Sequence, residues 1–590
     1  MLKFFLLLFI SALSPQVSAR VTIADSFGEK IFLNEKNEQV ILRGMNVSGS
    51  TKLLENNFRP FLNRQDAAIS FQLLKNNLGS NIVRLTVSWE GIQPTPNLID
   101  LQYVADIASF IQEAVKNDIY VLIDFHQDLF SRHIFSEEEK FKGNGAPYWV
   151  TPDFNDAGKC GIFCFHWAQN NLTNKTVKEA FRQFFNNQKI ESKYQGTDLI
   201  FNMQDTYINM LSSFMSLLKN NLSLAEWDKV IGVDPFNEPV DGGMEELSAK
   251  EWDQEKLWPF YLKIEKSLVQ KDLGELLIFA EPLVFWNNNV GLFSPRTGTG
   301  FYNGTLSNRF VFNGHYYDGK RQTPFVFKSV KPGDYLNEFD AIRNEAKRLN
   351  VAAFVSEFGA PLSLKKKRAP IPILRGIYLA LDQSTPKELT SKDNKKKSQI
   401  DEAIRGNFLS STLSYTQWHF DIYYNQHKNP FDSWNQENFS LIKNKQGEYN
   451  LPTELLERIQ ILSTPARIYQ SVSSSGNLGA EEKNWIGIYN QATKSVELAG
   501  KNFFFTAMTG TKNGGEHRIF IPKSFGPYLL ITAKNISKSQ TFGELKVKAE
   551  AEDDFIFITK EGDLSNYLSW QEGLRLQIKE KQSPIFILPD

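Results

Sequence analysis

The chain has 590 residues, of which 41% are hydrophobic and 23% are charged, and its formal net charge is −1. These proportions exclude a disordered or fibrous chain, and the length predicts two folded domains, one of them large. No basic stripe with interleaved aromatic residues is present in the sequence, so we expect no nucleic-acid partner.

The first 19 residues have the pattern of a secretory signal peptide. Met1-Leu2-Lys3 gives a basic start, residues 4–13 are apolar, and a small-residue site ends at Ala19. The apolar stretch is too short to span a membrane. We therefore expect cleavage after Ala19 and a protein that is secreted or held in the lysosomal or endomembrane lumen. N-glycosylation motifs, which fit this route, begin at Asn171, Asn174, Asn221, Asn303, Asn438 and Asn535, while the match at Asn46 follows a strand-like run where burial is an alternative.

The chain has two cysteines, Cys160 and Cys164, in a C-x3-C spacing. In an oxidising compartment this spacing is compatible equally with a local disulfide and with two free thiols. Two thiols make a poor metal site, and no cluster of metal-ligand type is visible in the sequence. We expect no metal and no other cofactor.

After the signal peptide, two short apolar runs at 21–23 and 31–33 predict a hairpin that caps a domain. Apolar runs of strand type then alternate with amphipathic stretches such as 101–117, 203–220 and 335–349. Eight such runs, each buried on both faces and separated by helices, predict an α/β fold, the (β/α)8 TIM barrel. The runs cover residues 40–44, 81–87, 119–125, 230–236, 276–281, 310–315, 351–357 and 413–418.

Other segments extend this plan. The long loop at 130–174 predicts a lid or a wall of a binding site. A lysine-rich segment at 364–399 predicts a solvated surface insertion, with contact to anionic lipid head groups or acidic glycans as the minor alternative. From about residue 471, short alternating runs between Gly and Asn turns predict a small antiparallel β-sandwich. The predicted domains are the barrel at 20–470 and the sandwich at 471–590.

Two glutamates stand where predicted strands end. Glu238 follows the fourth run within Asn237-Glu238-Pro239, and Glu357 follows the seventh. The carboxyl ends of barrel strands form one active face, so the two carboxyl groups are expected to converge there. Paired carboxyl groups carry out glycoside hydrolysis, and burial raises a Glu pKa toward that of a general acid. Taken alone, each Glu could instead be a buried ion-pair partner. Arg84 is expected to keep the nucleophile ionised, and Asn237 to bond a sugar 2-hydroxyl.

The two glutamate motifs, Asn237-Glu238-Pro239 and Glu357-Phe358-Gly359, resemble the signatures of glycoside hydrolase family 5, retaining enzymes with a (β/α)8 barrel. Within that family the chain looks most like the endoglycoceramidases, on three stretches: R-G-M-N-V-S-G-S-T-K at 43–52, D-F-H-Q-D at 124–128 and G-N-G-A-P at 143–147. One departure is A-R-I-Y-Q at 466–470, where those enzymes carry R-P-Y-P. The family's remaining active-site positions match Arg84, His126, His315, Tyr317 and Trp418, in the expected order along the chain.

The resemblance implies that Glu238 is the acid/base and Glu357 the nucleophile. It also implies that Lys52, Asp124, His126, Asn237 and Tyr317 contact the first sugars beside a ceramide. The implied reaction is hydrolysis of the oligosaccharide–ceramide linkage of glycosphingolipids by double displacement.

Alternatives stay open at this stage. A family 5 β-glucanase or another lipid β-glucosidase has the same signatures, and a catalytically inactive barrel that binds glycolipid is a different class. Glu281-Pro282 imitates the Glu238 motif at the fifth run, and we expect a structural or substrate-rim carboxylate there. The expected partners are the glycosphingolipid and a transient membrane or micelle surface, and we expect a monomer.

Overall fold

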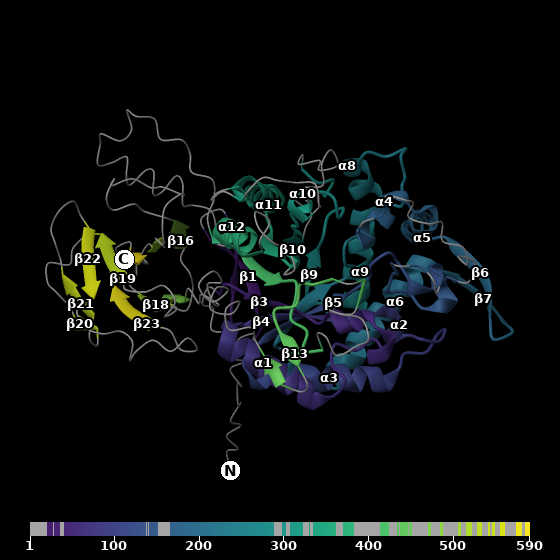
Figure 1. The fold of residues 1–590 in the computed structure, drawn as a ribbon, viewed down its shortest axis with the longest axis horizontal. Helices are drawn as coiled ribbons and strands as arrows, with labels where there is room; N and C mark the ends of the chain where they lie inside the picture. Colours follow the sequence, from purple (N-terminus) through teal and green to yellow (C-terminus); the bar gives the residue numbers. More distant parts are fainter. Residues whose placement is uncertain are drawn as a thin grey trace, which may run out of the picture.

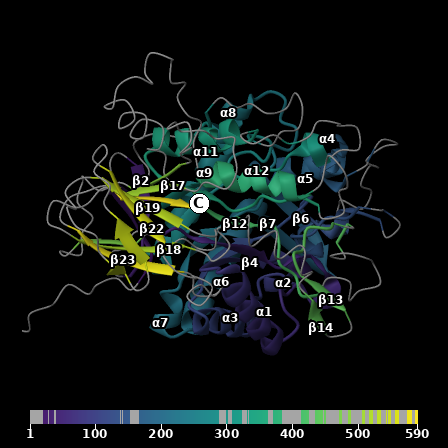
Figure 2. The ribbon, with the colours of Figure 1, turned by 60° about the vertical axis from the view of Figure 1, so that its left-hand side comes forward.

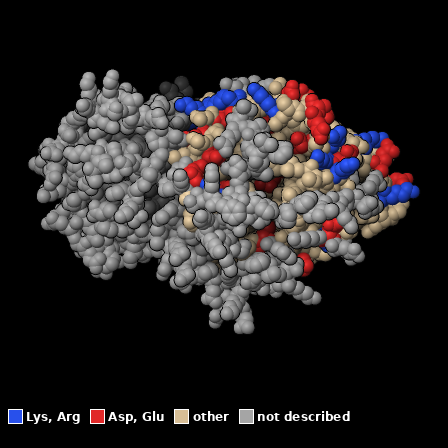
Figure 3. Space-filling view, turned by 45° about the horizontal axis from the view of Figure 1, so that its top comes forward, with Lys and Arg blue, Asp and Glu red and all other residues tan. Residues whose placement is uncertain are grey.

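A computed structural model describes residues 20–26, 29–35, 40–136, 139, 141–151, 164, 166–287, 298–301, 307–322, 330, 334–361, 370–382, 413–423, 434–435, 437–445 and 448–450, and beyond residue 469 ten strands. The predicted signal peptide lies outside these residues. Within the described parts of the chain, no helix is both long and apolar enough to cross a membrane. The face in Figure 3 shows Lys and Arg interspersed with Asp and Glu over its described part.

The centre of the fold is a closed barrel of eight parallel strands, with helices around it (Figure 1). Every predicted apolar run corresponds to one barrel strand, so the predicted (β/α)8 barrel is confirmed. The last strand pairs with the first and closes the ring. The strands are β3 (Arg43–Val47), β4 (Ile82–Val87), β5 (Tyr120–Phe125), β8 (Val230–Asp234), β9 (Leu277–Ala280), β10 (Phe310–Asn313), β11 (Ala352–Val355) and β12 (Ser414–Gln417).

The helices begin and end where the sequence supplies caps. The Asn63 side chain accepts a hydrogen bond from the Asp66 amide at the start of α1, and Gly79, with φ of 61°, ends it. Helices α1, α3 and α6 lie side by side on the outside of the barrel (Figure 2). The described helices are α1 (Arg64–Leu78), α2 (Trp89–Ile92), α3 (Leu101–Lys116), α4 (Asn170–Thr173), α5 (Lys175–Phe185), α6 (Met203–Asn220), α7 (Leu224–Trp227), α8 (Ala249–Trp252), α9 (Trp258–Gln270), α10 (Gly319–Gln322), α11 (Leu336–Leu349) and α12 (Pro370–Asp382).

An N-terminal hairpin closes one end of the barrel, as predicted. Strands β1 (Thr22–Ser26) and β2 (Glu29–Leu33) pair antiparallel. Phe32 of β2 stacks on Phe279 at 6.5 Å between ring centroids and meets the edge of Phe354 at 6.4 Å. These rings belong to an apolar cluster that also contains the first residues of several barrel strands, such as Ile82 and Leu277. The hairpin therefore seals the end of the barrel opposite the predicted active face.

The first predicted strand is wrong in its bounds. The expected run at 40–44 begins before the barrel does, since β3 starts only at Arg43. Val40 and Leu42 are buried in the closing cluster with Phe32, and the Val40 amide donates to the Phe32 carbonyl. Val40 and Leu42 are therefore apolar because they help to close the end of the barrel, and not because they form its wall.

The lysine-rich segment at 364–399 is only partly a surface insertion. Helix α12 lies inside it, between β11 and β12, and its Ile373, Leu374 and Ile377 are buried. The helix completes the outer layer of the barrel, which requires an apolar face there. Both lysine runs of the segment lie outside the described residues.

Two hairpins within the described residues were not predicted, one just before α6 and one between Lys443 and Asn450. Strands β6 (Lys189–Tyr194) and β7 (Thr197–Asn202) join through Gln195 and Gly196, which have φ of 50° and 82°. Two positive φ values in a two-residue turn suit a hairpin, and Gly at the second position was the available signal. The hairpin leads directly into α6.

Beyond residue 469 all described elements are strands (Figure 1). They form an antiparallel sheet of three strands, β15-β18-β23, and a second sheet of seven, β16-β17-β24-β19-β22-β21-β20. This agrees with an all-β C-terminal part, while the sandwich packing and the boundary near residue 471 stay predictions. A further hairpin, β13 (Lys443–Lys445) with β14 (Glu448–Asn450), precedes it. The C-terminal strands are β15 (Gln470–Ser473), β16 (Asn484–Gly487), β17 (Phe505–Met508), β18 (Gly515–Ile521), β19 (Tyr528–Ala533), β20 (Thr541–Phe542), β21 (Leu545–Lys548), β22 (Phe555–Lys560), β23 (Leu574–Glu580) and β24 (Ile585–Pro589).

The cysteine and glycosylation predictions have mixed outcomes. Cys164 is disulfide-bonded, and Cys160, the other cysteine of the chain, lies outside the described residues. Asn174 is buried and its side chain caps α5, so its side chain is not presented at the surface. Asn46 is buried as well. Of the other predicted acceptors, Asn171 and Asn438 are buried, Asn221 is exposed, and Asn303 and Asn535 lie outside the described residues.

Candidate active site

The barrel interior changes from apolar to charged along its strands. Residues two apart on a strand share a face, so Ile82 and Arg84 point the same way, as do Leu122 and Asp124. The first member of each pair joins an apolar cluster, and the second is a fully buried charge. The charged members gather at the carboxyl ends of the strands, where a TIM barrel places its active site.

Arg84 is the centre of this charged layer. Its guanidinium lies 2.9 Å from carboxylate oxygens of both Asp124 and Asp234. It also donates to Glu357 Oε1 at 2.6 Å and to Asn237 Oδ1 at 2.9 Å. A cation with no exposed surface requires this number of acidic partners. Arg84 therefore lies where the sequence placed it, against Glu357, while the role of Glu357 as nucleophile stays a prediction.

Glu357 is held as a carboxylate. Tyr317 donates its hydroxyl to Oε2 at 2.9 Å, while Arg84 binds Oε1. Burial acts to raise the pKa of Glu357, but the positive charges of His315 and Arg84 outweigh it and lower the pKa below its ordinary value. An ionised carboxylate is the state that a nucleophile requires.

Glu238 has the opposite environment. Burial is the largest influence on its pKa and raises it, and the nearby negative charge of Glu357 adds to the rise, against the His315 ring. His315 Nδ1 lies 3.2 Å from Glu238 Oε1. One oxygen of Glu238 and one of Glu357 lie within 4.8 Å of each other, which agrees with the close pair of carboxyl groups in a retaining glycosidase.

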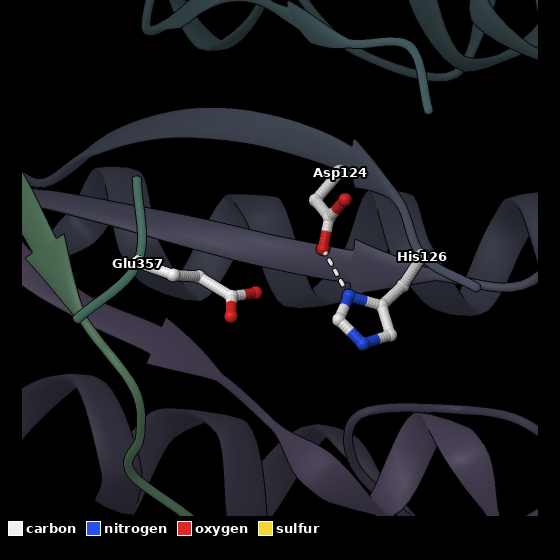
Figure 4. A group of neighbouring side chains, drawn as sticks. All are labelled: Asp124, His126 and Glu357. Carbon is white, nitrogen blue, oxygen red and sulfur yellow. Dashed lines mark hydrogen bonds and ion pairs between the residues drawn. The ribbon is translucent and has the colours of Figure 1, made fainter. Parts of the chain in front are cut away.

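A second charged group borders Glu357. Figure 4 shows Asp124 hydrogen-bonded to His126, with Glu357 pointing toward both. His126 Nδ1 lies 2.7 Å from Asp124 Oδ2, and Nε2 lies 3.2 Å from Asp128 Oδ2. Burial acts to lower the pKa of His126, but the two aspartates prevail and raise it to about 9. The His126 ring stacks on the Trp418 ring, with 5.2 Å between the centroids. The side chains of Asp124, His126, Asp128 and Trp418 therefore form one contiguous group.

Lys52 joins this group despite its distance in the sequence. Its Nζ lies 2.9 Å from Asp128 Oδ2, 4.3 Å from the Trp418 ring centroid and 4.1 Å from that of Trp434. A buried ammonium needs such carboxylate and aromatic partners. The structure therefore brings together all ten predicted site residues: Lys52, Arg84, Asp124, His126, Asn237, Glu238, His315, Tyr317, Glu357 and Trp418. Their individual roles stay predictions.

Glu281 was expected as a structural or rim carboxylate. The rim position is wrong, because the residue is buried at the centre of the site, 3.3 Å from Arg84 Nη2 and 3.0 Å from His315 Nε2. Other members of the site were not predicted from the sequence. Asp234 binds Arg84, Asn313 donates to Asp234, and Ser356 contacts His315. Glu437 and Trp434 border Lys52. For several, the available signal was a polar residue two positions after an inward apolar one.

Asp124, His126 and Glu357 lie close enough together to hold a metal ion. The guanidinium of Arg84 already contacts Asp124 and Glu357, and Lys52 contacts the adjacent Asp128. Side-chain cations thus supply the positive charge that these carboxylates require.

Fold and site together define a barrel hydrolase of glycosidic bonds, with two glutamates at strand ends whose pKa values are displaced in opposite directions. The chain belongs to glycosyl hydrolase family 5, since the family description "Cellulase (glycosyl hydrolase family 5)" matches residues 33–369.

Individual relatives have narrower descriptions than the family as a whole. An endoglycoceramidase from Cyanea nozakii is 24% identical over 375 residues, covering 59% of this chain and 69% of that protein. Another from Hydra vulgaris is 25% identical over 304 residues, and this chain spans only 50% of its length. Endo-glycoceramidase II from Rhodococcus sp., solved as a ganglioside GM3 complex, aligns over 95% of this chain and 100% of its own with a TM-score of 0.53 and 15% identity, a likeness of fold.

Proposed function

We propose that the protein is a retaining endo-β-glycosidase that hydrolyses the bond between the oligosaccharide and the ceramide of glycosphingolipids. The observation that carries the chemistry is the pair Glu238 and Glu357, within 4.8 Å and with pKa values displaced in opposite directions. The glycolipid substrate is supported by the similarity to endoglycoceramidases.

The first step forms a covalent glycosyl-enzyme. Glu357 attacks the anomeric carbon while Glu238 gives its proton to the glycosidic oxygen, so that ceramide leaves as an alcohol. Arg84 keeps Glu357 ionised before the attack, and Tyr317 donates to its second oxygen. In the second step Glu238, now a carboxylate, takes a proton from water, which attacks the anomeric carbon and releases the glycan with retained configuration.

The remaining charged group suits the sugar. Lys52, Asp124 and His126 offer donors and acceptors beside Glu357, and Trp418 offers an aromatic face. Asn237 is fixed by Arg84 and by the Gln127 carbonyl, which holds its amide next to Glu238. We assign these residues to the sugars nearest the cleaved bond.

Incubation of the protein with lactosylceramide, gangliosides and galactosyl-linked ceramides tests the substrate. We expect an intact oligosaccharide and free ceramide in equal amounts from at least one of these lipids. Cleavage of a soluble β-glucan without any ceramide release would replace the proposal with a family 5 glucanase. The panel also reports the preferred ceramide linkage and the accepted glycan length.

Trapping of the intermediate tests the mechanism separately. A 2-deoxy-2-fluoro glycoside with a good leaving group should label the protein, and peptide mass spectrometry should place the label on Glu357. Glu357→Gln is the matched control and should stay unlabelled. A label on another residue would contradict the assignment of the nucleophile.

The cellular site of action is proposed from the N-terminal pattern alone. Passage into the secretory lumen would remove residues 1–19 and bring the protein to glycolipids displayed on a membrane surface. N-terminal sequencing of the secreted or lysosomal form should find Arg20 first. Uncleaved, cytosolic protein would contradict this part of the proposal.

A further inference from the structure

Glu281 stands at the end of β9, outside the expected catalytic set, yet it contacts three members of that set. Its Oε2 accepts a hydrogen bond from the Glu238 amide at 3.0 Å. Its Oε1 lies 3.0 Å from His315 Nε2 and 3.3 Å from Arg84 Nη2. The residue is buried, so solvent does not replace these contacts.

The backbone of Glu238 gives the first contact its importance. Glu238 has φ of 45°, in the left-handed region that non-glycine residues seldom occupy because it is sterically unfavourable. Such a conformation persists only where neighbours fix it, and Glu281 binds the amide of this very residue. The direction in which the Glu238 side chain leaves the backbone therefore depends on Glu281.

His315 gives a second, independent connection. Its Nε2 side contacts Glu281 and the Ser356 hydroxyl, and its Nδ1 faces Glu238 Oε1 at 3.2 Å. Glu281 thus holds Glu238 at both ends, at the backbone amide directly and at the carboxyl group through the imidazole. Glu281 itself is anchored from outside the barrel, since Tyr261 of α9 donates its hydroxyl to the Glu281 carbonyl at 2.8 Å.

We propose that Glu281 is a positioning residue for the acid/base Glu238, aiming its carboxyl group at the glycosidic oxygen by clamping its amide and the His315 ring. The inference rests on the acid/base role proposed above for Glu238, but not on the identity of the lipid. It predicts that Glu281 affects one step of the reaction, the proton transfer from Glu238 to the leaving group.

The test compares leaving groups on one sugar. The dinitrophenolate of a 2,4-dinitrophenyl β-glycoside departs without protonation, whereas the phenolate of the phenyl β-glycoside needs a proton from the general acid. Glu281→Gln cannot present acceptor oxygens to both the Glu238 amide and His315. We expect it to lower kcat/KM for the phenyl glycoside about 10–100-fold, as a slightly misplaced catalytic group does, and to lower formation of the glycosyl-enzyme from the dinitrophenyl glycoside by no more than about threefold.

Glu345→Gln is the matched control. Glu345 is also a buried glutamate, but it lies on the outer helix α11, where it binds Arg348 of the same helix and Thr299. This variant should treat both substrates alike. An equal loss on both substrates in Glu281→Gln, or no loss on either, would overturn the proposal and leave Glu281 a structural carboxylate.

Tyr261→Phe provides a milder second variant if Glu281→Gln does not fold. It removes the hydroxyl that anchors the Glu281 carbonyl and keeps the ring. We expect a smaller loss, about 2–10-fold, again confined to the phenyl glycoside. Equal behaviour toward both substrates would count against the proposal. Because both arms use soluble aryl glycosides of the sugar that the wild type accepts, failure to release ceramide would overturn the proposed function and not this inference.

Discussion

The two ends of the barrel interior use the same eight strands for opposite purposes. At the amino ends, Phe32, Phe279 and Phe354 pack together with aliphatic side chains and exclude water. At the carboxyl ends, Arg84 is surrounded by carboxylates, two of which have raised pKa values in their folded environment, Asp234 and Glu281. Apolar packing stabilises the fold directly, whereas buried charges need every partner in place.

The difference shows where function is concentrated. The apolar end tolerates changes that keep volume, because dispersion and burial are not directional. The charged end depends on a few atoms at fixed distances, and one lost cation leaves several carboxylates uncompensated. The predictions below separate the two ends, from the largest expected effect to the smallest.

Glu357→Gln removes the proposed nucleophile and keeps its shape. We expect kcat/KM to fall by about 10⁴-fold or more, while the melting temperature stays close to that of the wild type. Steady-state kinetics with an aryl glycoside and thermal unfolding measure both. Retention of more than a small fraction of activity would mean that another group attacks the sugar.

Glu238→Gln should lower kcat/KM for glycosides with poor leaving groups by about 10²–10⁴-fold. Glycosides with good leaving groups should form the covalent intermediate at a much less reduced rate, since no proton is needed there. A burst followed by slow turnover would report the missing base in the second step. Equal losses for all leaving groups would contradict the acid/base assignment.

Arg84→Met and Phe32→Ala compare the two ends directly. Each should reduce the free energy of unfolding by about 3–5 kcal/mol, the first by leaving carboxylates unpaired and the second by opening a cavity. Only Arg84→Met should abolish activity below the melting temperature. Denaturant unfolding with parallel assays tests this, and loss of activity in folded Phe32→Ala would show that the ends are coupled.

The activity should follow a bell-shaped pH profile. Glu357 must be ionised, so kcat/KM rises about tenfold per pH unit below its lowered pKa, which lies under the ordinary 4.5. Glu238 must be protonated, so activity declines as pH rises through its raised pKa, above 4.5. A profile whose alkaline limb is unaffected by Glu238→Asp would assign that limb to another group.

The smallest effect concerns stability and His126. Its pKa is about 9 in the folded protein against 6.5 ordinarily, so the folded state binds the extra proton more tightly. The stabilisation is complete below about pH 6.5 and is lost as pH rises toward 9, by at most about 1.4 kcal/mol per pH unit. His126→Gln should flatten that slope in denaturant unfolding, and an unchanged slope would show that His126 is not charged.

Much of the barrel was predictable, because buried parallel strands appear as apolar runs whatever surrounds them. The first strand was misplaced since Val40 and Leu42 are apolar for a different reason, the seal with Phe32. Helix α12 was missed because lysine runs flank it in the sequence. Hairpin β6–β7 was missed because its alternating exposed residues resemble a polar loop.

By itself the sequence determined which residues meet at the predicted site: Glu238, Glu357 and Arg84 stand at strand ends that a closed barrel must bring together. Only the tertiary structure decided their states. Burial and the neighbouring carboxylate of Glu357 raise the pKa of Glu238 despite its contact with His315, whereas the charges of His315, Arg84 and Lys52 outweigh burial and lower the pKa of Glu357. Electrostatic energy depends on distances between residues far apart in the chain, and those distances exist only after the barrel closes.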